Sequence, residues 1–335
     1  MSRRCFPADA ARRARRMSGP PSVNGATPVA APPARRVPGR RRRWGIPVLG
    51  AVFAVFSTAC TAPPLLPEPR GPALRVATHN VHYIRHDRAR GRWSVADWEA
   101  RKHALDAVFK EADADLMAFQ EMVSFGLGED RTANLARDWL LARNPGYAVA
   151  ASGDWRRFPT RQPIFYRTDR LRLLDHGWFL FDPPEVLARE RARRRFWLYY
   201  ASWADFEDRQ GGSFRAYNLH FHYLHRGRRR EAARLAAAHI SEALDAGMPV
   251  LVLADMNALR GWQTTRILQA PGLRMVDPPG SSFHFNKGLH ILGPIDRLGH
   301  SAQIDLAAGP WTLRGRRAGD WPSDHYPVVA DVLLP

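Results

Sequence analysis

Several apolar stretches with the composition of β-strands end in a carboxylate, amide or imidazole side chain, and this pattern constrains the fold most. Leu74–Asn80 alternates and is rich in β-formers, while Asp115–Glu121 is a short apolar run that ends in polar residues. Buried strands of this kind deliver their last residues to one edge of a sheet. The polar strand ends are Asn80, Glu121, His220, Asp255 with Asn257, and the loop Ser323-Asp324-His325.

The rest of this region predicts a few helices among many short strands. Ser94 followed by Asp97 is typical of a capping box that opens a helix over about 95–112. Few helices, many strands and no internal repeat predict two packed β-sheets flanked by helices, in one domain that spans 74–335. Further helices are predicted at 131–143 and 228–246, and further strands at 147–151, 163–167, 171–181, 196–206, 214–220, 249–254, 295–299, 304–314 and 327–334.

The polar strand ends also indicate a kind of chemistry. Carboxylates and an amide oxygen suit a hard cation such as Mg²⁺, and imidazoles beside them suit proton transfer or contact with an anion. A single strand-end Asp or Asn is usually only a turn former, so the interpretation depends on the whole set. Additional histidines lie near these strands, but this region has no cysteine, and the carboxylates favour Mg²⁺ over zinc.

Taken in order, these segments resemble the motifs of the endonuclease/exonuclease/phosphatase family, which is DNase I-like. The resemblance extends from Leu74 to Leu334. It implies the family's α/β fold, a four-layer sandwich of two packed, mainly antiparallel sheets flanked by helices. The segments that carry it are THN at 78–80, FQE at 119–121, NLH at 218–220, ADMN at 254–257 and WPSDHYPV at 321–328.

The resemblance implies a divalent-metal-dependent phosphoesterase. Glu121 would bind Mg²⁺ or Mn²⁺, and Asn80 and Asp324 would lie close to the metal and the substrate phosphate. Such a site neutralises the charge that develops on the transferring phosphoryl group and supplies an activated water in line.

The same resemblance implies roles around the attacking water. Asp255 would align and deprotonate the water, and Asn257 would orient both Asp255 and the phosphate. His325 would contact the scissile phosphate. His220 would either stabilise the transition state or protonate the leaving oxygen.

The family also uses an aspartate that hydrogen-bonds to the closing histidine, here His325. Two residues are candidates, Asp296 and Asp305. Asp296 is favoured because it lies 12 residues after His284, in a segment that resembles the family's T-F-H segment, and because it leaves room for two strands before the closing loop, whereas Asp305 leaves little. The carboxylate that some members place before the 163–167 strand has no clear match, since Thr160 or Gln162 occupies that region. Its absence leaves the protonating role of His220 open.

The N-terminal segment accounts for most of the net charge of +18. Residues 1–43 hold twelve arginines and one acidic residue, and residues 44–60 are uncharged and mostly apolar. A basic stretch followed by a short apolar run and small residues is typical of a signal peptide. Ser57–Cys60 resembles a lipoprotein cleavage box, in which Cys60 would be acylated, and residues 61–73 form a proline-rich linker. An ordinary signal peptide or an uncleaved anchor is the alternative.

We therefore expect an exported enzyme, tethered to the cell envelope or secreted, that acts as a monomer on phosphodiesters. Nucleic acid and phospholipid headgroups are the candidate substrates. A lipid-headgroup, sugar or inositol phosphate phosphatase of the same family is one alternative, and a non-catalytic anion-binding module is another. A structural DNA-binding protein loses its support because most of the positive charge lies in the leader.

Overall fold

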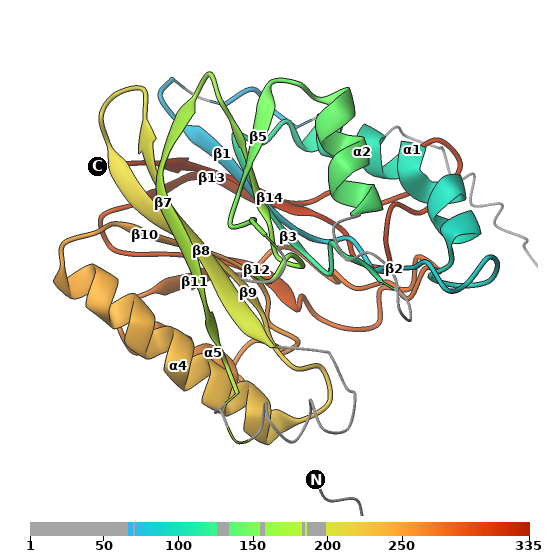
Figure 1. Ribbon diagram of the computed structural model, residues 1–335. Coiled ribbons are helices and arrows are strands. Elements are labelled where there is room, and N and C mark those ends of the chain that lie inside the picture. Colours follow the sequence, from blue (N-terminus) through green and yellow to red (C-terminus); the bar gives the residue numbers. More distant parts are fainter. Residues whose placement is uncertain (1–65, 70, 126–133, 155–157, 183–184, 186–198) are drawn as a thin grey trace, which may run out of the picture. The chain divides into compact units, whose positions relative to one another are not determined.

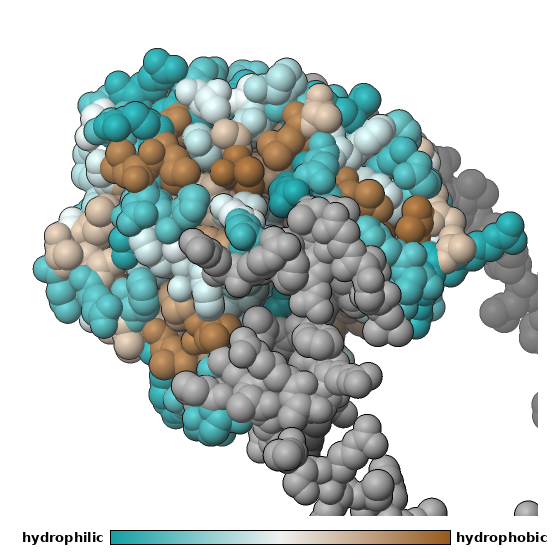
Figure 2. Space-filling view, in the orientation of Figure 1, coloured by the Kyte–Doolittle hydropathy of each residue, from teal (hydrophilic) through white to brown (hydrophobic). Residues whose placement is uncertain are grey.

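The computed structural model describes residues 66–69, 71–125, 134–154, 158–182, 185 and 199–335. The basic leader, the apolar segment with Cys60 and the start of the proline-rich linker lie outside these residues. Within the described residues, no helix is long and apolar enough to cross a membrane. On the face drawn in Figure 2, apolar residues gather in several groups that hydrophilic residues separate.

One six-stranded sheet holds the first polar strand end. Its central strand β1 pairs in parallel with β3 and antiparallel with β14, and the other pairs are antiparallel. In spatial order its strands are β13 (Asp305–Thr312), β14 (Val328–Leu333), β1 (Leu74–Asn80), β3 (Leu116–Gln120), β6 (Ile164–Arg167) and β5 (Tyr147–Ala150).

A second six-stranded sheet packs against the first. Its strands β9 and β10 are parallel, and its other neighbours pair antiparallel. In spatial order its strands are β11 (Arg274–Val276), β12 (Asp296–His300), β10 (Val250–Asp255), β9 (Ser213–His220), β8 (Tyr200–Asp208) and β7 (Leu171–Leu180). Two further short strands, β2 (Ile84–Arg85) and β4 (Ser124–Phe125), pair with each other outside both sheets.

Helices cover the outer face of each sheet (Figure 1). α1 (Val95–Ala112) and α2 (Leu135–Arg143) pack on the first sheet, and α4 (Arg226–Asp245) and α5 (Gln263–Gln269) pack on the second. A third apolar cluster, which includes Val76, Phe214 and Leu253, fills the space between the sheets. The predicted four-layer sandwich is therefore correct, and its core is three apolar layers between four layers of secondary structure.

Local sequence signals explain most element boundaries. The Ser94 side chain accepts a hydrogen bond from the Asp97 backbone N–H at 3.1 Å and so caps α1, as predicted. Asp97 itself forms an ion pair with Arg101, one turn along the helix. Helix α5 and strand β11 were not predicted, because seven and three residues are too short for a clear periodic pattern.

The parallel pairs explain why functional side chains converge. Asn80 lies beside Gln120 in the β1–β3 pair, and Asp255 lies beside His220 in the β9–β10 pair. Strand β12 runs the other way, so its first residue, Asp296, lies beside Asp255. Because parallel strands end at one edge of a sheet, each sheet presents its polar residues there.

Candidate active site

The Asp255 carboxylate connects the polar residues of both sheets. It is 1% exposed, and its Oδ2 accepts a hydrogen bond from Asn80 Nδ2 at 2.9 Å. Its Oδ1 accepts one from the Asn257 backbone N–H at 3.0 Å. Two imidazoles approach Oδ2, with His220 Nε2 at 3.6 Å and His325 Nε2 at 4.0 Å. Burial and the nearby Asp296 charge raise the pKa of Asp255 above its usual range.

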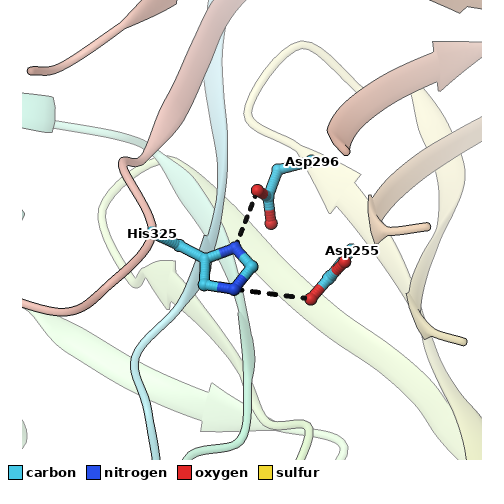
Figure 3. Close-up of side chains that lie close together, drawn as sticks. All are labelled: Asp255, Asp296 and His325. Atoms are coloured by element: carbon cyan, nitrogen blue, oxygen red, sulfur yellow. Dashed lines mark hydrogen bonds and ion pairs between the residues drawn. The ribbon is translucent and has the colours of Figure 1, made fainter. Parts of the chain in front are cut away.

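His325 lies between two carboxylates (Figure 3). Its Nδ1 is 2.8 Å from Asp296 Oδ2, while Asp305 lies exposed on β13. The structure thus brings Asp296, the favoured candidate, into contact with His325. Burial alone would lower the pKa of His325, but the charge and hydrogen bond of Asp296 outweigh it and raise the pKa to about 10. At neutral pH this imidazole therefore carries a positive charge.

His220 is the opposite case. Its Nε2 is 3.8 Å from Glu121 Oε1, yet burial, together with the positive charge of Arg161, lowers its pKa to about 3. This imidazole is neutral at neutral pH.

Arg161 was not anticipated from the sequence, which pointed instead to Thr160 and Gln162 for this region. Gln162 has a structural role, because its amide donates to the Asn218 carbonyl at 2.9 Å. The Tyr200 hydroxyl accepts hydrogen bonds from the backbone N–H groups of both Arg161 and Gln162. The available signal was a basic residue shortly before β6, a strand that begins at the active-site edge because it runs antiparallel to β3.

Glu121 and Asp324 form the acidic part of the site. Glu121 has a left-handed backbone with a φ of 56°, which turns the chain directly after β3. Burial and the charge of Asp324 raise the pKa of Glu121 to about 7. Burial would raise the pKa of Asp324 too, but the charges of His82 and His325 lower it. The Asp324 charge acts on Glu121, and a bound cation would suit such a pair of carboxylates because a positive charge removes their mutual repulsion.

Asn80 completes this oxygen-rich group. Its side-chain oxygen accepts the backbone N–H of His82 at 3.1 Å, and its amide also hydrogen-bonds to Glu121. The Ser323 hydroxyl donates to the Asn80 backbone carbonyl at 2.6 Å, so the end of β1 and the closing loop are joined. Glu121, Asp324 and Asn80 therefore offer oxygen donors that fit Mg²⁺ or Mn²⁺.

A second possible cation site consists of Asp255, Asp296 and His325, whose ligand atoms all lie within 4.8 Å of one another. These atoms already share hydrogen bonds, since His325 Nδ1 contacts Asp296 and Asp255 accepts from Asn80. A metal there would displace those bonds. The three residues are better explained as a charged His325 ring that hydrogen-bonds to Asp296 and forms an ion pair with Asp255. The group formed by Glu121, Asp324 and Asn80 is the better candidate for the cation.

Arg101 is a further residue that sequence analysis missed. Its guanidinium is buried and donates to the backbone carbonyls of Val81, His82 and Pro322 at 2.9, 2.9 and 3.0 Å. Val81 and His82 follow β1, and Pro322 precedes the closing loop with Asp324 and His325. Arg101 thus holds together the two loops that present Asn80 and His325. Its position on a helix, far from any motif, gave no sequence signal.

Comparison with known proteins agrees with this arrangement. A family model described as "Endonuclease/Exonuclease/phosphatase family" matches residues 77–325. The chain belongs to the endonuclease/exonuclease/phosphatase family. The matched region includes all the polar strand-end residues described above, from Asn80 to His325. No curated protein matches the chain.

Solved structures share the fold at low sequence identity. A family protein from Bacteroides thetaiotaomicron is 22% identical with a TM-score of 0.61, and the match covers 78% of this chain and 98% of that one. The mannosyl-6-phosphatase Bt3783 from the same organism is 23% identical with a TM-score of 0.61, covering 78% and 100%. D. rerio TDP2 in complex with a single-strand DNA product is 14% identical with a TM-score of 0.55, covering 78% and 99%. These similarities establish the fold.

Proposed function

We propose that the protein hydrolyses phosphoesters by attack of water, with a divalent cation as cofactor, and that phosphodiesters are its main substrates. The observation that carries the proposal is the convergence of seven residues at the strand ends of two sheets. They are Asn80, Glu121, His220, Asp255, Asn257, Asp324 and His325. Membership of a family of phosphoester hydrolases supports the same conclusion.

Asp255 is the group best suited to accept a proton from the attacking water. Burial raises its pKa towards neutral pH, where a general base is most effective. Hydrogen bonds from Asn80 and Asn257 hold both of its oxygens in place. Asn257 Nδ2 is itself engaged with the Phe221 carbonyl at 3.0 Å, so in this arrangement its backbone N–H is what orients Asp255.

His325 supplies positive charge to the phosphoryl group. Asp296 keeps it protonated and fixes the ring so that Nε2 faces Asp255 and the space where the phosphate would lie. A fixed positive charge in a water-poor site stabilises the additional negative charge of the transition state.

His220 stabilises the transition state rather than protonating the leaving oxygen. A neutral imidazole can donate one N–H bond to a phosphoryl oxygen, but it has no extra proton to give. The low pKa that burial and Arg161 impose on His220 therefore favours the first of its two expected roles.

Glu121, Asp324 and Asn80 would hold the cation, and Mg²⁺ or Mn²⁺ suits their oxygen donors. When bound, such an ion supplies positive charge beside a phosphoryl oxygen. Without it, Glu121 and Asp324 repel the substrate, so hydrolysis should depend on added metal.

The test uses the full chain with Mg²⁺ or Mn²⁺ on bis-p-nitrophenyl phosphate, DNA and lipid phosphodiesters. We expect metal-dependent turnover of at least one of them, and its loss in His325→Ala and Asp255→Ala. If wild type and both variants hydrolyse all three substrates at the same background rate, phosphodiester hydrolysis is contradicted; if wild type also releases no phosphate from mannose 6-phosphate, the protein is instead a non-catalytic anion-binding module.

A sugar phosphate monoester is the second candidate substrate. The observation that favours it is the similarity to mannosyl-6-phosphatase Bt3783, whose whole length matches this chain. Release of inorganic phosphate from mannose 6-phosphate, with no turnover of the three phosphodiesters, would select this candidate.

We also propose that the protein is exported and attached to a membrane through Cys60. The support is the basic, apolar and small-residue order of residues 1–60. Metabolic palmitate labelling of the full-length protein should be lost in Cys60→Ala. Equal labelling of wild type and variant would contradict acylation at this residue.

A further inference from the structure

Exposed large apolar side chains gather around the active site. Among the residues that the structure describes, nine such side chains are exposed. Six of them lie on three segments that flank the active-site ends of β9, β10 and β12, which we call the rim loops (residues 221–225, 256–262 and 281–295). These six are Tyr223, Leu224, Trp262, Leu289, Ile291 and Leu292.

Three of these six apolar side chains are mostly exposed to solvent. Tyr223 and Leu224 are each 64% exposed, and Ile291 is 70% exposed. Isolated exposed apolar residues are normal on any protein, but a group of them on adjacent loops marks an interaction surface. The other three, Leu174 on β7, Leu235 on α4 and Leu306 on β13, lie on separate elements.

The rim loops contact one another and form one surface. The guanidinium groups of Arg226 and Arg229 lie over the Trp262 ring, at 5.3 and 5.4 Å, and so join the first loop to the second. Arg229 also donates to the backbone carbonyl of Tyr223 at 3.0 Å, which holds that loop in place. The Leu259 side chain packs close to Gly293, since a Cβ added to this glycine would lie 3.4 Å from Leu259 Cδ2. The second loop therefore touches the third.

The third loop also contacts the active site directly. The Phe283 ring lies 4.8 Å from the His325 ring, and the His284 backbone N–H donates to the Asp324 carbonyl at 2.8 Å. The exposed aliphatic residues of this loop therefore lie on the border of the catalytic residues. Whatever the rim loops bind is brought next to His325.

The charge of this surface has one sign. Neither the rim loops nor residues 226–230 contain Asp or Glu, while Arg226, Arg230, Arg260 and Lys287 are exposed. Arg260 forms an ion pair with Asp277, outside the rim loops, but its side chain is still 85% exposed. A surface that combines basic and apolar side chains and lacks acidic ones is complementary to an anionic layer with an apolar interior.

We propose that the rim loops dock the protein on an anionic phospholipid surface, with the aliphatic side chains inserted among the lipids and the arginines at the phosphates. A single-stranded nucleic acid also offers phosphates, but four of the six exposed residues are aliphatic and cannot stack on bases in the way aromatic rings do. Docking goes beyond the proposed hydrolysis, since it requires no turnover. It would hold the active site at the membrane surface.

The experiment places one environment-sensitive label in the full chain. Cys5→Ser and Cys60→Ser remove the two native cysteines, and a nitrobenzoxadiazole label is attached at Ile291→Cys or, as the matched control, at Leu174→Cys, which is 43% exposed on β7. Vesicles of phosphatidylcholine with and without phosphatidylglycerol are then added. We expect a blue shift and brighter emission at position 291 with the anionic vesicles, and no change at position 174.

Vesicle sedimentation of two triple variants gives the second measurement. Leu224→Ser/Leu289→Ser/Ile291→Ser alters the rim, and Leu174→Ser/Leu235→Ser/Leu306→Ser removes exposed leucines elsewhere, while both keep the same N-terminal segment. Each aliphatic side chain lost from the rim should weaken binding about tenfold. The control should bind like wild type, and both variants should hydrolyse soluble substrates normally.

Three results would overturn docking. They are equal responses at positions 291 and 174, equal sedimentation of the two triple variants, and a response at position 291 to single-stranded DNA but not to vesicles. All of these are read without turnover, so they are independent of whether the proposed hydrolysis is found.

Discussion

The two active-site histidines have similar burial and opposite charge. His220 ends a strand of the second sheet, and His325 lies in the loop that closes the chain; they are 8% and 6% exposed. Both face the same oxygen of Asp255. Yet the pKa of His220 falls to about 3, whereas that of His325 rises to about 10. Burial acts on both in the same direction, so the difference comes from their other neighbours.

Those neighbours are Asp296 and Arg161. A carboxylate at 2.8 Å keeps His325 charged, and a guanidinium helps to keep His220 neutral. Burial favours the neutral form of both rings, and the charge and hydrogen bond of Asp296 make His325 the charged one. One histidine can then hold an anionic phosphate by charge, and the other can only donate a hydrogen bond.

Removal of the cation should have the largest effect. Chelation with EDTA should reduce turnover to the background rate, and added Mg²⁺ or Mn²⁺ should restore it, because Glu121 and Asp324 otherwise repel the phosphate. Without the cation His325 should stay charged and His220 neutral, since Asp296 and Arg161 remain. Activity that survives chelation would break the assignment of Glu121, Asp324 and Asn80 to a metal.

Asp296→Asn should have the next largest effect. We expect a loss of about 100-fold in kcat, a typical loss for a proton-handling group. The amide keeps the shape but not the charge, so the pKa of His325 falls. The alkaline limb of the pH–rate profile should move to lower pH. Asp305→Asn, an exposed Asp-to-Asn change on β13, is the control and should leave the profile where it is.

The same pair of variants tests stability. A histidine whose pKa is raised by folding adds stability that is fully present below its unfolded pKa, here 6.5, and lost as pH rises through its folded pKa of about 10. Wild type and Asp305→Asn should lose this increment between those values in urea titrations. If the free energy of unfolding of Asp296→Asn falls by the same amount over this pH range, His325 is not the source of the lost stability.

Arg101→Gln should lower kcat by about tenfold, because Arg101 acts through backbone positions rather than on the substrate. Its carbonyl partners belong to the loops that present Asn80 and His325, so the variant should misplace these two side chains and leave His220 in position. Arg101→Lys should recover part of the loss. Unchanged pH dependence together with unchanged kcat in Arg101→Gln would refute a positioning role.

Arg161→Gln should have the smallest effect. The pKa of His220 should rise, but it should stay below its usual value because burial is the larger cause of the shift. An NMR titration of the histidines measures this shift, with Arg161→Lys as the variant that keeps the charge. A fall in the pKa of His220 in Arg161→Gln would contradict the proposed origin of its neutrality.

The sequence predicted the fold and the strand-end residues because both depend on local patterns. Leu74–Asn80 and Val250–Asp255 are buried strands that end in polar side chains, and parallel pairing brings those ends to one edge. Asp296 was favoured over Asp305 by its distance from the family-like segment around His284 and by the room that it leaves for two strands before the closing loop. Contacts between distant segments were not predictable in this way. Arg161 and Arg101 reach the site through a turn and a helix whose orientation depends on the packed structure.

Turnover of bis-p-nitrophenyl phosphate by Asp255→Asn tests the central claim most directly, since this one carboxylate meets both histidines and Asn80. With saturating Mg²⁺ or Mn²⁺, we predict that the variant is slower than wild type by about a thousandfold, as expected when a general base is removed. Asp305→Asn should match wild type. Equal metal-dependent turnover by wild type and Asp255→Asn would contradict the account.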